Sequence, residues 1–479
     1  MSVLIAVLYF INLLFALFLV FYKERDTGVT WAWLLVFIFI PFLGFLLCLF
    51  FGMGLSEKEK FSIEKQTITE LSSLKDMYDP THQLYANDPI DKKYDQIAHF
   101  MSNLNQAPLT HHNDVTIFTD GKAKFEALKK DIKNAKRNIH IEYYAFVTDD
   151  TGMELVDLLT EKANEGVEIC LLYDELGSKG IKKEKLQALL NAGGKTQTFI
   201  TSQKAILKFR ANYHDHRKIV VIDGKIGYVG GFNIADQYVE TTEKFGYWRD
   251  THIRIVGPAT SLLELRLLTD WNVSSPQSSK LAGNIDYFYR DAPNLEAKTD
   301  IQIIASGPHN EKQQIKLAFA KLITSAKKRI WIQTPYFIPD DTILDALKIA
   351  KKSGVEVKIM IPNKPDHPFI YRATEYFAQV VMKEDVDIYI YDAGFLHSKV
   401  LIMDDDISIV GSANQDIRSY KLNFEASAVL YSHEINKELT KAYENDLAVS
   451  KKMTHEMIKE MSIWVKFKQK TARLFSPIM

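Results

Sequence analysis

One pattern occurs twice in this chain of 479 residues and constrains its fold more than any other feature. It consists of a histidine, a lysine two positions later and an aspartate, followed by a glycine and an asparagine at the same distances in both copies. The copies are His216, Lys218, Asp223, Gly230 and Asn233, and His397, Lys399, Asp404, Gly411 and Asn414. A single copy would be typical of a strand end with solvated charges. Two copies with matching spacing indicate an internal duplication.

The segments around the two motifs repeat as well. A strand, a helix, a stop glycine and a second strand are predicted at 139–146, 153–164, 166 and 167–173, and again at 330–337, 342–352, 354 and 355–361. Residues 135–139 (AKRNI) also resemble residues 326–330 (AKKRI). Because this order is typical of α/β sheets, we predict two similar α/β domains, over 107–290 and 291–446, packed as a pseudo-two-fold pair.

Two apolar runs precede these domains. Residues 1–22 and 27–56 contain no charged side chain, and about 20 apolar residues suffice to cross a bilayer. We therefore predict a hairpin of two transmembrane helices, at about 3–22 and 31–51, within residues 1–55. A cleaved signal peptide fits poorly, because no basic segment precedes the first run and the second follows at once. Basic residues flank the second run on both sides, so they leave its orientation open.

The remaining segments are a linker and a C-terminal helix. Residues 56–106 are polar and mixed in charge, which predicts a linker. In residues 447–479, Met457, Ile458, Met461 and Trp464 recur at helical spacing beside several basic residues, which predicts an amphipathic helix. Packing against the domain is the favoured role of this helix, and contact with an anionic membrane surface is the alternative.

Charge and cysteine content exclude several classes of function. The chain has 59 basic and 60 acidic residues, a formal net charge of -1, which argues against general attraction to nucleic acid. Its two cysteines, Cys48 and Cys170, lie in apolar segments and suggest neither a disulfide framework nor a thiolate metal site. His214 and His216 have the spacing of a metal-binding pair, but Lys218 beside them would repel a cation. We predict no metal and no cofactor.

Strand geometry predicts the arrangement of each motif. His216 and Lys218 are two residues apart, so their side chains point to the same face of a strand. A hairpin turn at Asp223 then brings Gly230 opposite Lys218 and Asn233 beside His216. A glycine at that corner leaves room for a phosphate to approach the backbone.

The second copy folds in the same register about residues 404–406, and brings His397, Lys399 and Asn414 together. Asp223 and Asp404 then lie at the turns, away from the histidines. We therefore expect these two aspartates to be structural.

The paired motifs resemble those of the phospholipase D superfamily, and longer stretches resemble its bacterial cardiolipin synthases. These stretches are residues 212–234, 245–258, 333–339 and 394–425. The two apolar runs and the ending at 472–477 also fit, so the resemblance covers nearly the whole chain. Two pairs depart from the family's usual residues, His214-Asp215 in place of Arg-Asn and Ala426-Ser427 in place of Val-Asn.

The resemblance implies two phospholipase-D-type domains and a two-step phosphatidyl transfer that needs neither a nucleotide nor a metal. By analogy, His216 is the nucleophile and His397 is the acid and later the base, although the symmetry of the motifs leaves this order open. Four groups are expected to balance or bind the phosphate charge, Lys218, Lys399, Asn233 and Asn414.

Three further residues are assigned by the same resemblance. Glu425 matches the family's supporting acid for the later motif, and Asp250 is the corresponding candidate for the first half. A surface charge is the alternative for each. Ser412 is expected to donate to the phosphate, where Gly231 stands in the first half.

The reaction implied is the conversion of two phosphatidylglycerols into cardiolipin and glycerol, on the cytoplasmic side of a bacterial cell membrane. A hydrolytic phospholipase D, or a transferase with another acceptor alcohol, would carry the same motifs. A membrane-tethered nuclease and a lipid-binding scaffold are less favoured, because the chain is not basic and both motifs are intact. The partners expected are phosphatidylglycerol and cardiolipin, without nucleic acid, and the sequence leaves the oligomeric state open.

Overall fold

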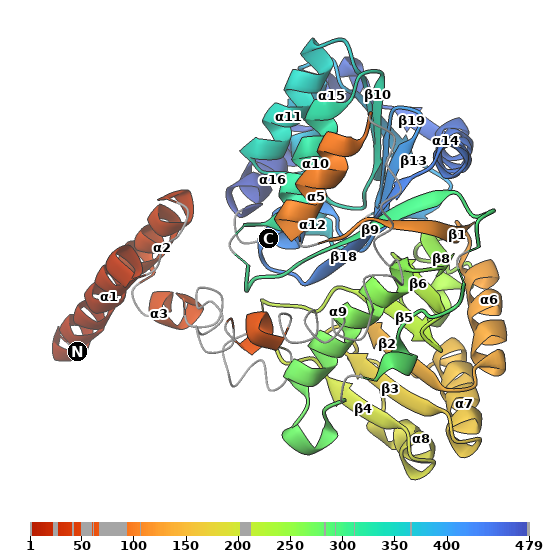
Figure 1. Cartoon of the computed structure of the whole chain (residues 1–479). Helices are drawn as coiled ribbons and strands as arrows, with labels where there is room; N and C mark the ends of the chain where they lie inside the picture. The colour runs from red at the N-terminus through yellow and green to blue at the C-terminus, as the bar shows by residue number, and fades with distance from the viewer. Residues whose placement is uncertain are drawn as a thin grey trace.

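The computed structural model describes residues 2–22, 27–40, 43–48, 60, 62–66, 93–105, 107–201, 212–281, 284–292, 294–310, 312–364 and 366–476. The chain forms a large α/β body and a small group of N-terminal helices that lies beside it (Figure 1).

A 15-stranded sheet runs through the whole body (Figure 1). The first half of the chain contributes seven strands, β1 (Thr110–Phe118), β2 (Asn138–Tyr143), β3 (Glu168–Tyr173), β4 (Lys195–Thr198), β5 (Lys218–Ile222), β6 (Ile226–Gly230) and β8 (His252–Val256). The second half contributes β9 (Thr299–Ser306), β10 (Arg329–Gln333), β12 (Glu356–Pro362), β13 (Asp387–Tyr391), β15 (Val400–Met403), β16 (Ile407–Gly411), β18 (Glu425–Tyr431) and β19 (Ser450–Lys452).

The order of the strands reveals an approximate two-fold axis. From the edge to the centre, the first half reads β4-β3-β2-β5-β6-β8-β1, and the second half reads β13-β12-β10-β15-β16-β18-β9 after the edge strand β19. The two orders correspond strand by strand, and β1 pairs antiparallel with β9 where they meet. The α/β architecture of two similar halves is confirmed. Their strands form one continuous sheet because the two central strands hydrogen-bond to each other.

Helices cover the sheet and repeat between the halves. The first half has α6 (Gly121–Asn134), α7 (Asp150–Asn164), α8 (Gln187–Asn191) and α9 (Ala259–Ser274). The second half has α10 (Gln314–Ser325), α11 (Asp341–Lys352), α12 (Pro368–Met382), α13 (Ile417–Lys421) and α14 (His433–Ala448).

The matching helices α7 and α11 start and stop by the same local signals. The side chain of Asp149 accepts a hydrogen bond from Gly152 N at 3.1 Å, and that of Asp340 accepts one from Ile343 N at 3.3 Å. After each helix comes a glycine with positive φ, 90° at Gly166 and 88° at Gly354, which allows the chain to turn back into the sheet. The stop glycines predicted from the sequence are confirmed.

The N-terminal helices are α1 (Ser2–Tyr22), α2 (Thr27–Phe39) and α3 (Gly44–Leu47). α1 lies against α2, where Asn12 Nδ2 donates to Phe37 O at 3.2 Å. Within the part of the chain that the structure describes, none of the helices combines the length and the apolar composition that crossing a bilayer requires. Residues 41–42 and 49–51 of the second predicted span lie outside the described residues.

Most of the predicted linker over 56–106 also lies outside the described residues. Its end forms α5 (Asp95–Asn105), whose Ile97, Ala98 and Met101 are buried in the core of the second half with Ile304. This end of the segment is therefore part of the folded body.

The single C-terminal helix predicted over 447–479 is wrong. The chain instead forms β19, which pairs with β13, then α15 (His455–Glu460) and α16 (Ile463–Leu474). Two capping residues separate these elements, since Thr454 accepts from Met457 N and Ser462 from Val465 N. α16 packs against α12, so the favoured role of this segment, packing on the domain, is confirmed.

Candidate functional site

A cavity of about 700 Å³ lies between the two halves, and residues of both motifs line it. His216 and Asn233 come from the first half, and His397 and Asn414 come from the second. Lys218 and Lys399 are buried next to the histidines. The structure therefore brings the two copies of the motif to a single site.

The hairpins have the register that the sequence predicts. Ile219 pairs with Val229, which sets Lys218 opposite Gly230, and Val400 pairs with Val410 in the second half. Because both hairpins have the same register, each motif presents its histidine and asparagine at the corresponding end of its strands.

Each histidine is held by a contact between the halves. β7 (Tyr247–Arg249) runs parallel to β14 (Gly394–Leu396), with Leu396 paired to Arg249. The residues that follow this pair are therefore neighbours, Asp250 from the first half and His397 from the second. The equivalent contact is a parallel bridge between Asp215 and Phe424.

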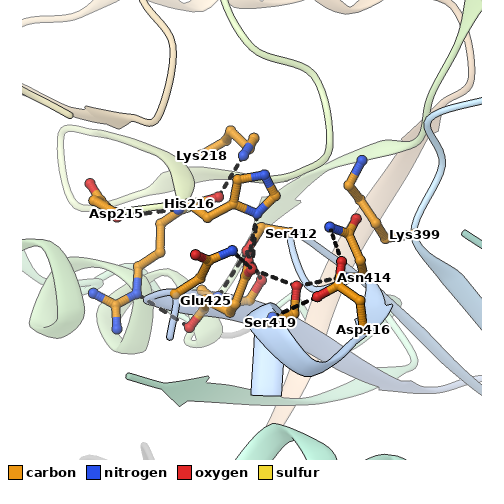
Figure 2. Close-up of polar contacts among 12 residues, drawn as sticks. Asp215, His216, Lys218, Lys399, Ser412, Asn414, Asp416, Ser419 and Glu425 are labelled. Atoms are coloured by element: carbon orange, nitrogen blue, oxygen red, sulfur yellow. Dashed lines mark hydrogen bonds and ion pairs between the residues drawn. The ribbon is translucent and has the colours of Figure 1, made fainter. Parts of the chain in front are cut away.

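The Asp215–Phe424 bridge sets His216 beside Glu425. His216 Nδ1 lies 2.9 Å and 3.0 Å from the two carboxylate oxygens of Glu425, which is completely buried. Ser412 Oγ and Ser419 Oγ donate to the same carboxylate at 2.5 Å and 2.9 Å (Figure 2), and Asn423 Nδ2 donates at 3.3 Å. Glu425 is thus held by a network of neutral donors.

The second histidine has a simpler partner. His397 Nδ1 lies 2.5 Å from Asp250 Oδ2, and the backbone N–H of Thr251 donates to Asp250 Oδ1 at 2.7 Å. Lys399 Nζ lies 3.9 Å from the same carboxylate. Asp250 thus has a cation 3.9 Å away, whereas the hydrogen-bond donors to Glu425 are hydroxyl and amide groups and the charge of Lys218 also acts on it.

The expected assignment of the two carboxylates to their own halves is wrong. Glu425 follows the later motif but pairs with His216, and Asp250 belongs to the first half but pairs with His397. The two parallel contacts between the halves cause this crossing. The alternative that either residue is a surface charge is also wrong, because both are buried.

The pKa values of the two histidines and of their two carboxylates follow from burial and neighbouring charge. Burial, with Lys218 and Lys399 nearby, lowers the pKa of His216 well below its usual value. The same causes, with Lys399 as the main charge, lower that of His397 to about 4. Both imidazoles are therefore neutral near pH 7, and Nε2 can act as a nucleophile or base when Nδ1 donates to the carboxylate.

The two carboxylates differ in pKa. Burial raises the pKa of Glu425 to about 7. Burial acts in the same direction on Asp250, but the charge of Lys399 and the interaction with His397 outweigh it and lower the pKa of Asp250 below its usual value. Near neutral pH, Asp250 is ionised and Glu425 is close to its titration midpoint.

The lysines are close to the histidines but point to backbone oxygens. Lys218 Nζ donates to His216 O at 2.5 Å, and Lys399 Nζ donates to His397 O. Burial lowers the pKa of Lys218 to about 7 and that of Lys399 to about 8. A bound phosphate anion would favour their charged forms, so substrate binding and lysine protonation are coupled.

The asparagines reach the cavity with different partners. Asn233 Nδ2 donates to the hydroxyl of Tyr238 at 2.8 Å, and Asn414 Nδ2 donates to Asp416 Oδ2 at 3.1 Å. Each amide nitrogen has a second hydrogen, which can bind a phosphate oxygen. Ser412 differs from the expectation, because its hydroxyl donates to Glu425.

Gly231, at the position of Ser412, lies directly against the other carboxylate. A Cβ atom built on Gly231 would lie 1.9 Å from Asp250 Oδ1. A side chain at this position would therefore displace Asp250, and a glycine is required.

Asp223 and Asp404 hold the hairpin turns, as predicted. Asp223 accepts from the backbone N–H groups of residues 136–138, and Asp404 accepts from those of residues 327–329. Both have positive φ, 54° and 50°. These N–H groups belong to the repeated segments at 135–139 and 326–330, so the similarity of those segments follows from a shared role in binding the motif aspartates.

Several cavity residues were not identified from the sequence. The ring of Tyr144 contacts His216 edge-on at 5.0 Å between centroids, and Trp248 lies 5.2 Å from His397. Ser419 and Asn423, which orient Glu425, were also missed. Trp248, Ser419 and Asn423 stand within stretches that resemble the family, which was the available signal.

His214 and His216, which have the spacing of a metal-binding pair, each place Nδ1 beside a carboxylate. His216 Nδ1 is used by Glu425, and His214 Nδ1 lies 3.6 Å from Asp174. Among the described residues, one group of potential ligands lies close together, His140, Glu168 and Cys170. None of its three members lines the cavity.

Comparisons with known proteins agree with this geometry. A family model described as a cardiolipin synthase, phospholipase-D-like domain, matches residues 128–247 and 319–447. A model described as the N-terminal region of phospholipase D–nuclease proteins matches residues 7–52.

Two relatives match the chain over nearly its whole length. A cardiolipin synthase of Listeria monocytogenes serotype 4a (strain HCC23) is 42% identical over 489 residues, which cover 100% of this chain and 99% of the relative. A cardiolipin synthase of Staphylococcus aureus (strain Mu50 / ATCC 700699) is 44% identical over 481 residues, 98% of this chain and 95% of the relative.

Among solved structures, phosphatidylserine synthase from Haemophilus influenzae Rd KW20 has a similar fold. The TM-score is 0.59 with 16% identity, over 80% of this chain and 100% of that one. At this identity, the similarity supports the two-domain α/β architecture.

Proposed function

Because the chain belongs to the family of cardiolipin synthases with a phospholipase-D-like domain, we propose that its cavity transfers a phosphatidyl group between two phosphatidylglycerols. The products are cardiolipin and glycerol. One observation carries the proposal: two histidines, each hydrogen-bonded through Nδ1 to a buried carboxylate, line the same cavity.

In the first step, Nε2 of His216 attacks the phosphorus of one phosphatidylglycerol. A P–N bond forms, and the bond from phosphorus to the oxygen of the headgroup glycerol breaks. His397, protonated once the phosphate anion is bound, gives its proton to the leaving alkoxide, and free glycerol departs. The diacylglycerol phosphate remains covalently attached to His216.

In the second step, a hydroxyl of the other phosphatidylglycerol headgroup replaces the departed glycerol. His397, now neutral, removes the proton from this hydroxyl as its oxygen attacks phosphorus, and the P–N bond breaks. Cardiolipin is released, and both histidines return to their starting states. The P–N bond preserves the energy of the original ester, so the sequence needs no nucleotide.

The environments of the two histidines support these roles. The carboxylate of Asp250 is ionised at neutral pH and can stabilise the imidazolium of His397, which the acid requires. His216 has to be neutral to attack, and burial and the nearby lysines keep it so. We therefore assign His216 as the nucleophile and His397 as the acid and base.

The phosphate charge is balanced by groups around the cavity. Lys218 and Lys399 supply positive charge, and the amides of Asn233 and Asn414 donate to the non-bridging oxygens. Such fixed donors stabilise charge as it shifts during transfer. Glu425 acts indirectly, because it holds the ring of His216 in position, and Ser412 and Ser419 hold Glu425.

We propose further that residues 1–55 anchor the body in the bacterial cell membrane as the two-helix hairpin, with the cavity on the cytoplasmic side. Large apolar side chains of α1 and α2 are exposed, among them Val3, Phe10, Leu13, Trp31, Ile38 and Phe39. Water would disfavour this surface, and lipid would cover it. Anchoring would also keep the body close to two substrates that reside in the bilayer.

The test is to incubate the full chain in detergent–lipid micelles with radiolabelled phosphatidylglycerol as the only substrate. Cardiolipin and glycerol in equal amounts support the proposal. Phosphatidic acid as the main product would instead indicate a hydrolase. A single-stranded DNA substrate tested in parallel should remain intact, and its cleavage would indicate a nuclease.

The covalent step is tested separately by an alkaline quench, which preserves phosphohistidine. Lipid phosphate labelled with ³²P should attach to the full chain and be absent from the His216→Asn variant. Attachment to His397 instead would reverse the two roles and leave the overall reaction unchanged.

A further inference from the structure

The C-terminal helix α16 has two distinct faces, and one of them packs on the body. Ala472 and Gln469 are buried, and Gln469 Nε2 donates to Glu375 Oε2 of α12 at 3.1 Å. The Arg473 guanidinium lies 5.3 Å from the ring centre of Tyr376, also on α12. These contacts fix the rotation of α16 about its own axis.

The opposite face of α16 is apolar and uncovered. Ile463, Phe467 and Leu474 are four and seven residues apart, so they share one side of the helix. They are 85%, 59% and 74% exposed, and the neighbouring Trp464 is 72% exposed. Single exposed apolar residues are common, but four on one face of a short helix form a continuous patch.

Basic residues border this patch on both sides. The helix Ile463–Leu474 carries Lys466, Lys468, Lys470 and Arg473 and no acidic residue, in a chain whose net charge is only -1. At 100° per residue, Lys468 falls on one side of the apolar stripe, and Lys466 and Lys470 fall on the other. An apolar stripe between lysines matches the boundary between the headgroups and acyl chains of an anionic bilayer.

The position of α16 in the molecule agrees with this. In Figure 1, α16 lies on the edge of the body that faces α1–α3. α16 packs on α12, and Phe475, just after α16, contacts Phe369 of α12 at 5.7 Å between ring centres. His367 and Ile370, two residues before and one residue after the exposed Phe369, line the cavity.

We propose that α16 is a second membrane contact, which lies in the anionic surface of the bilayer with Ile463, Trp464, Phe467 and Leu474 inserted. It orients the body so that the side of the cavity near α12 faces the lipid. The occupant of this surface is an anionic bilayer, and a second copy of the chain is the alternative that the experiment excludes. The proposal concerns membrane contact and does not depend on the reaction.

The test uses full-length protein with the substitution Trp464→Cys, labelled with a polarity-sensitive fluorophore. Cys48 and Cys170 are buried, so the label selects the new cysteine. A His216→Ala background keeps the lipid composition constant. The protein is reconstituted in vesicles of phosphatidylcholine alone or with phosphatidylglycerol. A matched label at Leu190→Cys, an exposed apolar position on α8 in the other half, serves as the control.

In vesicles with phosphatidylglycerol, the label at 464 should shift to the blue, become protected from an aqueous quencher and be quenched by lipids that carry a nitroxide on the acyl chain. The label at 190 should show none of these changes. Each Lys→Gln change at Lys468 or Lys470 should lower the equilibrium constant for membrane binding of α16 about fivefold, the usual effect of one basic residue at an anionic surface.

Equal quenching at 464 and 190 in both vesicle types would overturn the proposal. Protection at 464 that rises with protein concentration and is the same in both vesicle types would also overturn it, because it would indicate a second copy. Because the readout is fluorescence of an inactive chain, neither result depends on whether the protein makes cardiolipin.

Discussion

The two halves of the cavity carry the same histidine, lysine and asparagine but hold their histidines in different ways. His216 contacts Glu425, which accepts from two serine hydroxyls and whose pKa burial raises to about 7 against the charge of Lys218. His397 contacts Asp250, whose pKa Lys399 and His397 lower against the effect of burial. The duplication thus supplies two equivalent imidazoles, and the different residues around their carboxylates support the roles that we propose, attack for His216 and proton transfer for His397.

The largest losses of activity are expected when either histidine is replaced, and a second substrate distinguishes the roles of the two. His216→Ala should lower the rate of cardiolipin formation by about 10⁴-fold or more, because no covalent intermediate can form. His397→Ala should cost a similar factor with phosphatidylglycerol. With a p-nitrophenyl phosphodiester, whose leaving group needs no proton, release of nitrophenol should recover in His397→Ala and stay absent in His216→Ala. Recovery in His216→Ala instead would reverse the comparison.

The next effect compares the two carboxylates. Asp250→Asn should lower kcat/KM by about 10³-fold, because a neutral amide cannot stabilise the imidazolium of His397. Glu425→Gln should cost about 10²-fold, because Glu425 is already partly protonated at pH 7. Steady-state kinetics on the two variants, with folding checked by circular dichroism, measure both. Equal losses would mean that the two pairs are functionally equivalent.

Gly231 and Ser412 occupy equivalent positions beside the two carboxylates, so the effects of substituting each can be compared. Gly231→Ala should lower activity by about 10²-fold, because its Cβ would lie 1.9 Å from Asp250 Oδ1 and would displace that carboxylate. Ser412→Gly removes one of several donors to Glu425 and should cost about tenfold. A greater loss for Ser412→Gly would show that this hydroxyl does more than orient Glu425.

The pH dependence of kcat/KM should show the effect of the raised pKa of Glu425, as a smaller change than those above. Ionised Glu425 orients His216, and its pKa is raised to about 7, so kcat/KM should rise as pH increases through about 7. Lys218 and Lys399, with pKa values of about 7 and 8, lose their charge as the pH rises through these values, so the rate should fall again and the optimum should be narrow. Glu425→Gln should abolish the rising limb and keep the falling one. A rising limb that survives in this variant would assign it to another group.

The smallest effect on catalysis is expected at the turns. Asp223→Ala and Asp404→Ala each remove a carboxylate that accepts from three backbone N–H groups. Each should lower the stability of its half by about 2 to 3 kcal/mol, measured as a lower denaturant midpoint. Activity per folded molecule should fall less than tenfold. A catalytic loss as large as that of His216→Ala, with stability intact, would assign these aspartates a direct role.

Much of the fold could be predicted because its signals are local. The hairpin register follows from the period of two in a strand and from the turn at Asp223, and the stop glycines Gly166 and Gly354 follow from the backbone angles that end a helix. The C-terminal segment was mispredicted although its signals were local too, since Thr454 and Ser462 are both residues that favour helix starts.

The sequence alone determined that the chain has two equivalent motifs and which side chains each strand presents, because these depend on residues a few positions apart. The tertiary structure alone decided which carboxylate serves which histidine. Glu425 is 209 residues from His216, and Asp250 is 147 residues from His397. Pairs so distant meet only because the halves pack about a two-fold axis, where β7 lies parallel to β14 and Asp215 bridges to Phe424.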